Sequence, residues 1–172
     1  MKGKTHLLTD YFKSLADVAK QGDATEQSFY GCLETLCQQF AASTGRNEIH
    51  VTTLPKKTEA GNPDFRAWNG QDRIVGYLES KNPTESNLDH IEETEQLHRY
   101  RQTFPNLLLT NFFEFRLYRN GQMVDHVLAA RPIALQLGHV PPVEKGDELL
   151  GLLEQFFSFS LPKAYTAEAL AV

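Results

Sequence analysis

The sequence predicts an α/β domain in which a mixed central sheet is flanked by helices. Apolar residues recur at helical spacing before residue 45 and again after residue 145. Between these regions the period changes to short strand-like runs that are separated by turn signals. A chain of 172 residues with 41% hydrophobic and 23% charged residues has the size and composition of one globular domain.

The first 45 residues predict two helices. The first covers about residues 8–20 and ends at Gln21-Gly22-Asp23, and the second begins near Asp23 or Thr25. Apolar residues of the second helix recur at i, i+4, i+7, i+8 and i+11, which is a helical stripe: Phe29, Leu33, Leu36, Cys37 and Phe40. Cys32 and Cys37 lie about 140° apart around such a helix, so we expect reduced packing residues rather than a disulfide or a metal pair.

Three strands are expected next, over residues 48–53, 64–68 and 74–81. Asn69-Gly70 supplies a turn signal between the second and the third. A helix over about residues 88–102 follows, with acidic side chains in its first turn and basic ones in its last. This polarity suits the helix dipole and supports the helical prediction.

The C-terminal third predicts a buried strand, a hairpin and a helix. The strand covers residues 106–111, and its Leu107-Leu108-Leu109 run is typical of a strand covered on both faces. Residues 114–119 and 122–127 predict a hairpin across Asn120-Gly121. The last helix carries one apolar stripe: Leu149, Leu150, Leu153, Phe156 and Phe157. The predicted order is helix, three strands, helix and strand, followed by the hairpin and the last helix. This order is typical of the α/β class.

Charge and hydropathy exclude some classes of protein. The net charge of −5 and the pI near 5.7 argue against an autonomous nucleic-acid binder, which usually has a basic face. No apolar run approaches the roughly 18 residues of a membrane span. Asp10 and Lys13 interrupt the apolar stretch that a signal peptide would need. We therefore expect a cytoplasmic protein without a membrane partner.

The candidate catalytic residues are Asp64, Glu79 and Lys81. Hydrolysis of a phosphodiester needs a hydroxide near neutral pH and stabilisation of the charge that builds on the phosphate, and one or two Mg²⁺ ions supply both. Mg²⁺ takes hard oxygen ligands and keeps several waters, so two carboxylates are a sufficient contribution from the protein. A lysine nearby can stabilise the developing charge or orient the attacking water.

The strand geometry decides whether these residues converge. Glu79 and Lys81 share one face of their strand because residues i and i+2 point the same way. A loop over residues 69–72 would place Asp64 opposite Tyr77, with Glu79 its diagonal neighbour at about 7–8 Å between backbones. A six-residue loop would place Asp64 directly opposite Glu79, whereas a two-residue Asn-Gly turn would hold them too far apart. The prediction therefore requires the wider loop.

Two runs of sequence resemble the motifs of the PD-(D/E)xK nuclease superfamily. Gly61-Asn62-Pro63-Asp64-Phe65 and Gly76-Tyr77-Leu78-Glu79-Ser80-Lys81 are similar to its PD and ExK halves. Gln96 and Tyr100 resemble the QxxxY motif of its RecB-like members. The order of elements matches the αβββαβ core of that superfamily over about residues 24–111. The resemblance implies a restriction-endonuclease-like fold with a mixed central sheet, plus a C-terminal hairpin and helix.

A narrower resemblance covers residues 57–119. This run is similar to the N-terminal nuclease domain of fused restriction–modification enzymes of the type IIG and type ISP-like kinds, in which an adenine-specific DNA methyltransferase follows. It implies a nuclease-like domain over residues 1–158 and a tail over residues 159–172 that leads toward a downstream methyltransferase. No FxGxG loop is present, so no S-adenosylmethionine site is expected in this chain. The implied partners are double-stranded DNA and the methyltransferase and target-recognition regions of the same polypeptide.

The implied function is a Mg²⁺-dependent DNA endonuclease. Asp64 and Glu79 would bind the metal with the backbone carbonyl of Ser80, and Lys81 would assist the attack. Gln96 and Tyr100 would support Lys81 or the DNA backbone. Further contacts are expected from residues near the site: Glu26 to the metal, and Lys56, Lys57, Arg99 and Arg101 to DNA.

Each of these residues also has a structural explanation. Glu79 and Lys81 would be an ion pair at a solvated strand end, and Glu26 would form a capping box with Asp23. Gln96 and Tyr100 would belong to an ordinary helix surface or to the edge of the core. Lys56 and Lys57 would lie in a solvated loop, and Trp68 is expected to pack rather than to stack on a base.

Two other functions remain as rivals. The first is a nuclease fold without catalysis, which docks or positions DNA, and metal binding without cleavage would favour it. The second is a part of the DNA adenine methyltransferase itself, which S-adenosylmethionine binding would favour.

Overall fold

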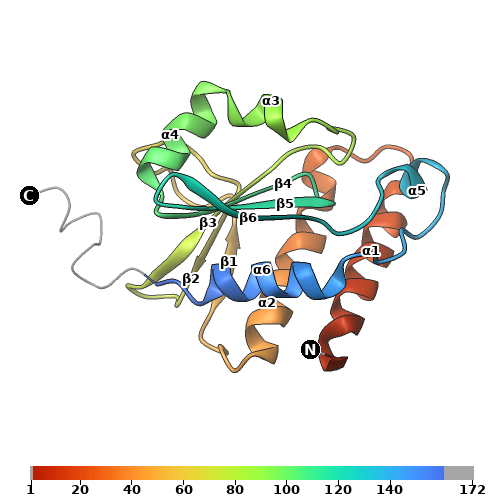
Figure 1. The fold of residues 1–172 in the computed structure, drawn as a ribbon, viewed down its shortest axis with the longest axis horizontal. Coiled ribbons are helices and arrows are strands. Elements are labelled where there is room, and N and C mark those ends of the chain that lie inside the picture. Colours follow the sequence, from red (N-terminus) through yellow and green to blue (C-terminus); the bar gives the residue numbers. More distant parts are fainter. Residues whose placement is uncertain (1, 161–172) are drawn as a thin grey trace, which may run out of the picture.

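Six strands form one mixed sheet, and their order in the sheet follows their order in the sequence (Figure 1). A computed structural model describes residues 2–160 of the chain. Neighbouring strands of this described part are antiparallel except β3 and β4, which are parallel. The strands are β1 (His50–Thr53), β2 (Phe65–Trp68), β3 (Ile74–Ser80), β4 (Asn106–Thr110), β5 (Glu114–Arg119) and β6 (Gln122–Leu128).

Helices cover both faces of this sheet. On one face lie α1 (Thr5–Ala19), α2 (Tyr30–Ser43) and α6 (Gly146–Phe157), and on the other lie α3 (Leu88–Glu92) and α4 (Glu95–Thr103), which connect β3 to β4 (Figure 1). A short helix, α5 (Ile133–Gln136), follows β6. Two shorter 3₁₀ turns precede α1 and α2: η1 (Lys2–Lys4) and η2 (Glu26–Phe29).

The hydrophobic core has two parts because side chains alternate between the faces of a strand. The larger part lies between the sheet and helices α1, α2 and α6, and it receives Phe65 from β2 and Leu78 from β3. The smaller part lies under α3 and α4 and receives Leu107 and Leu109 from β4. Strand β4 is buried along its whole length, which confirms the prediction from its leucine run.

Two helix predictions need correction. The helix expected over residues 88–102 is two helices, because Thr94 starts a new one: its hydroxyl oxygen accepts a hydrogen bond from the N–H of Leu97 at 3.3 Å. The second helix does not start with a capping pair of Asp23 and Glu26. Instead the N–H of Thr25 donates to the hydroxyl of Ser28 at 3.0 Å, and α2 begins only after η2. Glu26 is therefore free of a capping role.

The β2–β3 connection sets the register on which the site depends. It is a five-residue loop in which the side-chain oxygen of Asn69 accepts hydrogen bonds from the three backbone N–H groups of residues 71–73, at 3.0 to 3.1 Å. A bulge between Ala67 and Trp68 shifts the pairing by one residue, so Phe65 pairs with Leu78. Asp64 therefore lies opposite Glu79, in the register that a six-residue loop would have produced.

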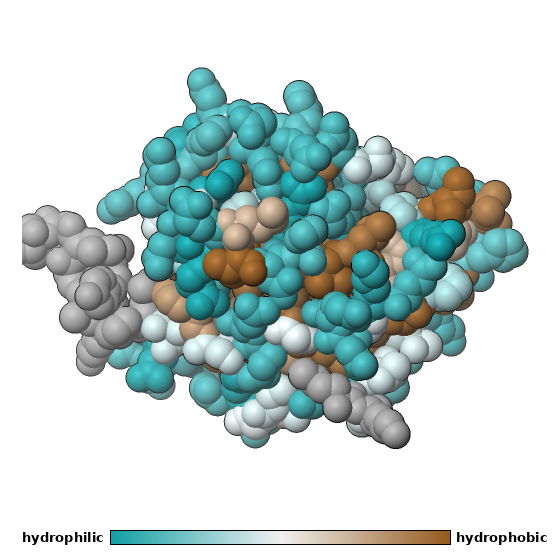
Figure 2. All heavy atoms as spheres, in the orientation of Figure 1, coloured by the Kyte–Doolittle hydropathy of each residue, from teal (hydrophilic) through white to brown (hydrophobic). Residues whose placement is uncertain are grey.

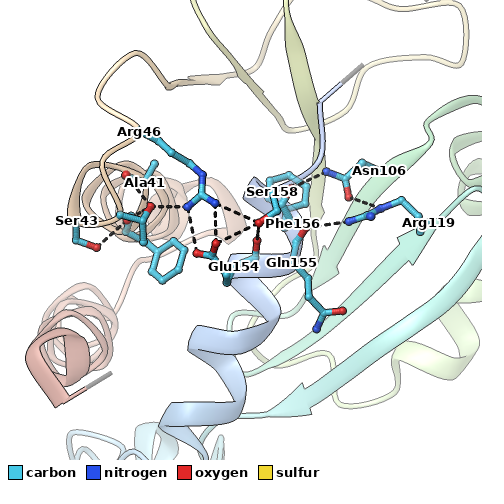
Figure 3. Close-up of polar contacts among 11 residues, drawn as sticks. Ala41, Ser43, Arg46, Asn106, Arg119, Glu154, Gln155, Phe156 and Ser158 are labelled. Carbon is cyan, nitrogen blue, oxygen red and sulfur yellow. Dashed lines mark hydrogen bonds and ion pairs between the residues drawn. The ribbon is translucent and has the colours of Figure 1, made fainter. Parts of the chain in front are cut away.

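Helix α6 is attached to the sheet through buried polar contacts (Figure 3). The amide nitrogen of Asn106, which is 0% exposed, donates to the carbonyl oxygens of Val75 at 3.0 Å and Phe156 at 2.8 Å. Its oxygen accepts from Arg119 at 3.3 Å. At Gly76 a Cβ atom would stand 2.5 Å from the Asn106 carbonyl oxygen, so only glycine permits this close approach. These contacts fix the starts of β3 and β4.

An arginine–glutamate pair also holds the C-terminal part of α6. Arg46, which follows α2, donates to both carboxylate oxygens of Glu154, at 3.1 and 2.7 Å (Figure 3). This bidentate pair joins α2 to α6 and lies partly in solvent.

Some apolar side chains remain exposed on the described surface. Figure 2 shows them over β6 and around α5: Met123, Val124, Leu128, Ile133, Leu137 and Val140. Within residues 2–160 no helix is both long and apolar enough to cross a membrane. Most of the predicted tail, residues 161–172, lies outside the described residues.

Candidate active site

Asp64 and Glu79 meet at one end of the β2–β3 hairpin. Asp64 directly precedes β2, and Glu79 is the next-to-last residue of β3. The backbone N–H of Asp64 donates to Oε1 of Glu79 at 3.3 Å. The backbone of Asp64 thus lies against the Glu79 carboxylate, as the register of the two strands requires.

Three donors hold the Asp64 carboxylate in place. The Tyr30 hydroxyl donates to Oδ1 at 2.9 Å, and Ser80 donates to Oδ2 from its N–H at 2.8 Å and from its hydroxyl at 3.1 Å. Burial and the charge of Asp64 raise the pKa of Tyr30, so its hydroxyl stays protonated and remains a donor. Tyr30 comes from α2, and its role could not be predicted from the sequence, since one tyrosine beside a helical stripe carries no signal of such a contact.

The carboxyl group of Glu79 is buried beside a second negative charge. Glu79 is 3% exposed. Burial raises its pKa to about 8, the neighbouring Asp64 carboxylate adds to the rise, and Lys81 opposes it. The alternative of a solvated strand end is therefore wrong for Glu79.

Lys81 bridges the sheet and helix α4. Its Nζ lies 3.3 Å from Oε2 of Glu79 and donates to Oε1 of Gln96 at 3.2 Å. The Gln96 amide nitrogen in turn donates to the Tyr100 hydroxyl at 3.4 Å. Burial, together with the charges of Glu79 and Asp64, raises the pKa of Tyr100 to about 12. The QxxxY pair thus lies against the lysine, as predicted.

Glu26 adds a third carboxylate near these residues. It is the first residue of η2, and its Oε1 is buried without a hydrogen-bond partner among the described residues. Burial and the charge of Asp64 raise its pKa, while Lys81 lowers it. A buried oxygen of this kind is costly unless a donor or a cation faces it.

The oxygen atoms at this end of the hairpin suit a hard divalent cation. No group of three or more His, Cys, Asp and Glu side chains is arranged to hold a metal within residues 2–160. Asp64 and Glu79 nevertheless form the two-carboxylate set that Mg²⁺ uses together with water. A cation between them would also relieve the repulsion that adds to the effect of burial on the pKa of Glu79. The residues present fit the ion that their chemistry implies.

Of the four basic residues that were predicted to contact DNA, three lie near the candidate site and one lies elsewhere. Lys56 and Lys57 are exposed just before the turn of residues 58–61, and Arg99 is exposed while its Nε donates to the Ala60 carbonyl at 3.3 Å. Arg101 instead donates to the carbonyl of Gly121, at 3.2 and 2.9 Å.

The expectation that Arg101 lies beside the site is wrong. Gly121 is in the β5–β6 turn, and β5 is antiparallel to β4, which is parallel to β3. This turn therefore lies at the end of the sheet opposite Glu79. Arg101 is displaced because α4 runs away from the site. Gln96 near the start of the helix contacts Lys81, and five residues later the helix has risen about 7.5 Å toward the opposite end of the sheet.

Comparison with known proteins shows a likeness of fold to solved structures. No family model and no curated protein matches the chain. The structure is similar to a chain in the cryo-EM structure of a DrdV–DNA complex, with a TM-score of 0.67 and 24% sequence identity. The match covers 92% of this chain and 14% of that chain, so this chain spans about one seventh of the length of that neighbour. The fold is α/β and restriction-endonuclease-like, as the sequence predicted.

Proposed function

We propose that this chain carries a Mg²⁺-dependent DNA endonuclease domain that hydrolyses phosphodiester bonds. The observation that carries the proposal is the convergence of Asp64, Glu79 and Lys81 at one end of a single hairpin. The structural neighbour is a DNA complex, which supports DNA as the substrate.

Asp64 and Glu79 would hold the ion, with the backbone carbonyl of Ser80 as a third oxygen ligand. Bound there, Mg²⁺ supplies a nucleophilic hydroxide near neutral pH and neutralises charge on the phosphate. Tyr30 and the N–H of Ser80 keep the Asp64 carboxylate oriented toward Glu79. The buried position of Glu79 keeps water from competing for its oxygens.

Lys81 would stabilise the negative charge that develops on the phosphate. The Gln96 side-chain oxygen directs its ammonium group, and Tyr100 directs Gln96. This chain of contacts reduces the freedom of a long flexible side chain, which places its charge where the reaction needs it.

In the full protein this domain would act beside other regions. The neighbouring chain is about seven times longer than the part that matches. A fused restriction–modification enzyme, in which a downstream methyltransferase and a target-recognition region follow, is the arrangement we propose for the whole polypeptide.

Substitution of the three residues tests the mechanism. Asp64→Ala and Glu79→Ala should abolish both cleavage of DNA and binding of Mg²⁺, while Lys81→Ala should abolish cleavage and leave Mg²⁺ binding largely intact. The difference follows because the two carboxylates would be ligands of the ion, whereas the protonated amine of Lys81 would not. Plasmid cleavage and calorimetric Mg²⁺ titration measure the two effects, and wild-type cleavage by any of the three variants would refute the mechanism.

A second candidate function is a nuclease fold that positions DNA without cutting it. The likeness in fold to a chain of a DNA complex is equally consistent with this function. Binding of Mg²⁺ by the wild-type chain with no cleavage of any DNA substrate would support this alternative.

A further inference from the structure

A polar and aromatic strip runs along β2 away from the candidate active site. We define this Arg66 strip as Thr52, Arg66, Trp68 and Tyr77. Asp64, Arg66 and Trp68 alternate with buried Phe65 and Ala67, so all three point to the face of the sheet that α4 partly covers. Arg66 pairs with Thr52 of β1 and Tyr77 of β3, which extends the strip across three strands.

The strip is held rigidly around one guanidinium group. The guanidinium of Arg66 stands 4.0 Å from the centre of the Trp68 ring, which is a cation–π contact. The indole N–H of Trp68 donates to the Thr52 hydroxyl at 2.9 Å, so the ring is fixed. Tyr77 stacks on Phe104 with ring centres 4.1 Å apart. Burial raises the pKa of Tyr77, and the charge of Arg66 opposes that rise, which places the two side chains together.

Arg66 nevertheless has no acidic partner. Three other arginines of the described chain form ion pairs: Arg46 with Glu154, Arg116 with three carboxylates, and Arg131 with Glu144. The side chains of three more, Arg99, Arg101 and Arg119, donate to uncharged oxygens. Among residues 2–160 no carboxylate lies within ion-pair distance of Arg66, and its buried Nε has no hydrogen-bond acceptor. Arg66 is only half-buried, so an anion from outside can approach it.

We propose that Arg66 binds a backbone phosphate of the DNA strand that is cut at Asp64, Glu79 and Lys81. This inference rests on the proposed function and extends its substrate contact. Arg66 is two residues from Asp64 on the same face, which is about 7 Å along the strand. That distance corresponds to about two nucleotides of axial rise. A planar guanidinium donates two parallel hydrogen bonds to a phosphate, and its contact with Trp68 orients it before DNA arrives.

The matched pair Arg66→Gln and Arg73→Gln tests the proposal. Arg73 lies exposed in the loop of the same hairpin, outside the strip, so both variants lose the same charge. Binding of a labelled duplex is followed by fluorescence anisotropy in Ca²⁺ at low salt, where phosphate contacts are strongest. We expect Arg66→Gln to weaken binding about tenfold and to lower the slope of log K against log salt by about 1. Arg73→Gln should change neither by a comparable amount.

Arg66→Lys and a metal titration complete the experiment. Lysine keeps the charge and loses the planar pair of donors, so it should restore the salt slope without restoring the full affinity. Mg²⁺ binding and the thermal unfolding midpoint of Arg66→Gln should match those of the wild type, which separates a DNA contact from a folding defect. If the wild type binds DNA and the two variants Arg66→Gln and Arg73→Gln change its affinity and salt slope equally, the proposal for Arg66 is overturned and the proposed function is not. Wild-type protein that neither binds nor cleaves DNA would overturn the proposed function as well.

Discussion

At the scale of single residues, the carboxyl group of Glu79 lies where burial and a neighbouring negative charge both oppose its ionisation. Its pKa rises from an ordinary value near 4.5 to about 8. Lys81 compensates this only in part, from 3.3 Å. Two carboxylates placed in this way repel each other, and this repulsion, together with the burial of Glu79, appears as a dependence of stability on pH.

We predict that the stability of the metal-free protein falls as the pH rises from about 4.5 through about 8. The raised pKa means that the folded state holds a proton which the unfolded state releases above about 4.5. The stabilisation is complete below that pH and is lost by the time Glu79 ionises in the folded state. Glu79→Gln keeps the shape of the protonated group and removes its titration, so the variant should be the more stable protein at pH 8.5.

Urea unfolding in EDTA at pH 5.5 and pH 8.5 measures this effect. The difference in unfolding free energy between wild type and Glu79→Gln is the relevant quantity, because the titrations of other groups largely cancel in it. We expect a change of a few kcal/mol between the two pH values. A difference that stays constant with pH would contradict the prediction.

At the scale of elements, the site depends on how β3 and β4 are held at their starts. Residues Glu79 and Ser80 end β3, and the side chain of Asn106 at the start of β4 joins that strand to β3 and α6 (Figure 3). A fully buried amide with two accepting carbonyls can be removed only at the cost of leaving those carbonyls without donors.

We predict that Asn106→Ala destabilises the fold by about 3 kcal/mol, because two buried carbonyls, of Val75 and Phe156, lose their donor. The matched control is Arg46→Ala, which removes a partly exposed ion pair to Glu154 and should cost about 1 kcal/mol. Chemical denaturation of both variants provides the comparison. A cost for Asn106→Ala no greater than that for Arg46→Ala would show that α6 is not anchored through the amide.

At the scale of the whole molecule, the charge of the chain opposes its proposed substrate. The net charge is −5, and DNA is repelled by such a protein at long range. Lys56, Lys57 and Arg99 are exposed near the site, and Arg101 is directed to the opposite end of the sheet. Few phosphates can therefore be neutralised by this domain alone.

We predict that the isolated 172-residue chain binds short duplex DNA weakly and without sequence preference, with a Kd no better than about 10⁻⁵ M at physiological salt. Delivery of DNA would then fall to other regions of a longer protein. Titration of labelled duplexes of different sequence in Ca²⁺ measures the affinity. Tight and sequence-selective binding by this chain alone would mean that it carries its own recognition surface.

Most helices and strands, and the three central residues of the candidate site, could be predicted from the sequence alone. Helical stripes and strand alternation depend on local backbone geometry, so they can be read from residues close together in the chain. Glu79 and Lys81 had to share a face for the same reason. Asp64 could be placed beside them because one short loop leaves few registers, although a bulge next to Trp68, which the sequence does not signal, selected among them.

The residues from distant parts of the chain that surround these three could not be predicted, because tertiary packing brings them there. Tyr30 reaches Asp64 across 34 positions of sequence, and Glu26 approaches the site because α2 packs against the sheet. Arg101 was misplaced and Arg66 was missed, since the direction of α4 and the pairing of β1 with β2 decide what each guanidinium faces. Such contacts follow from the packing of whole elements, and packing leaves no periodic pattern in the residues that it brings together.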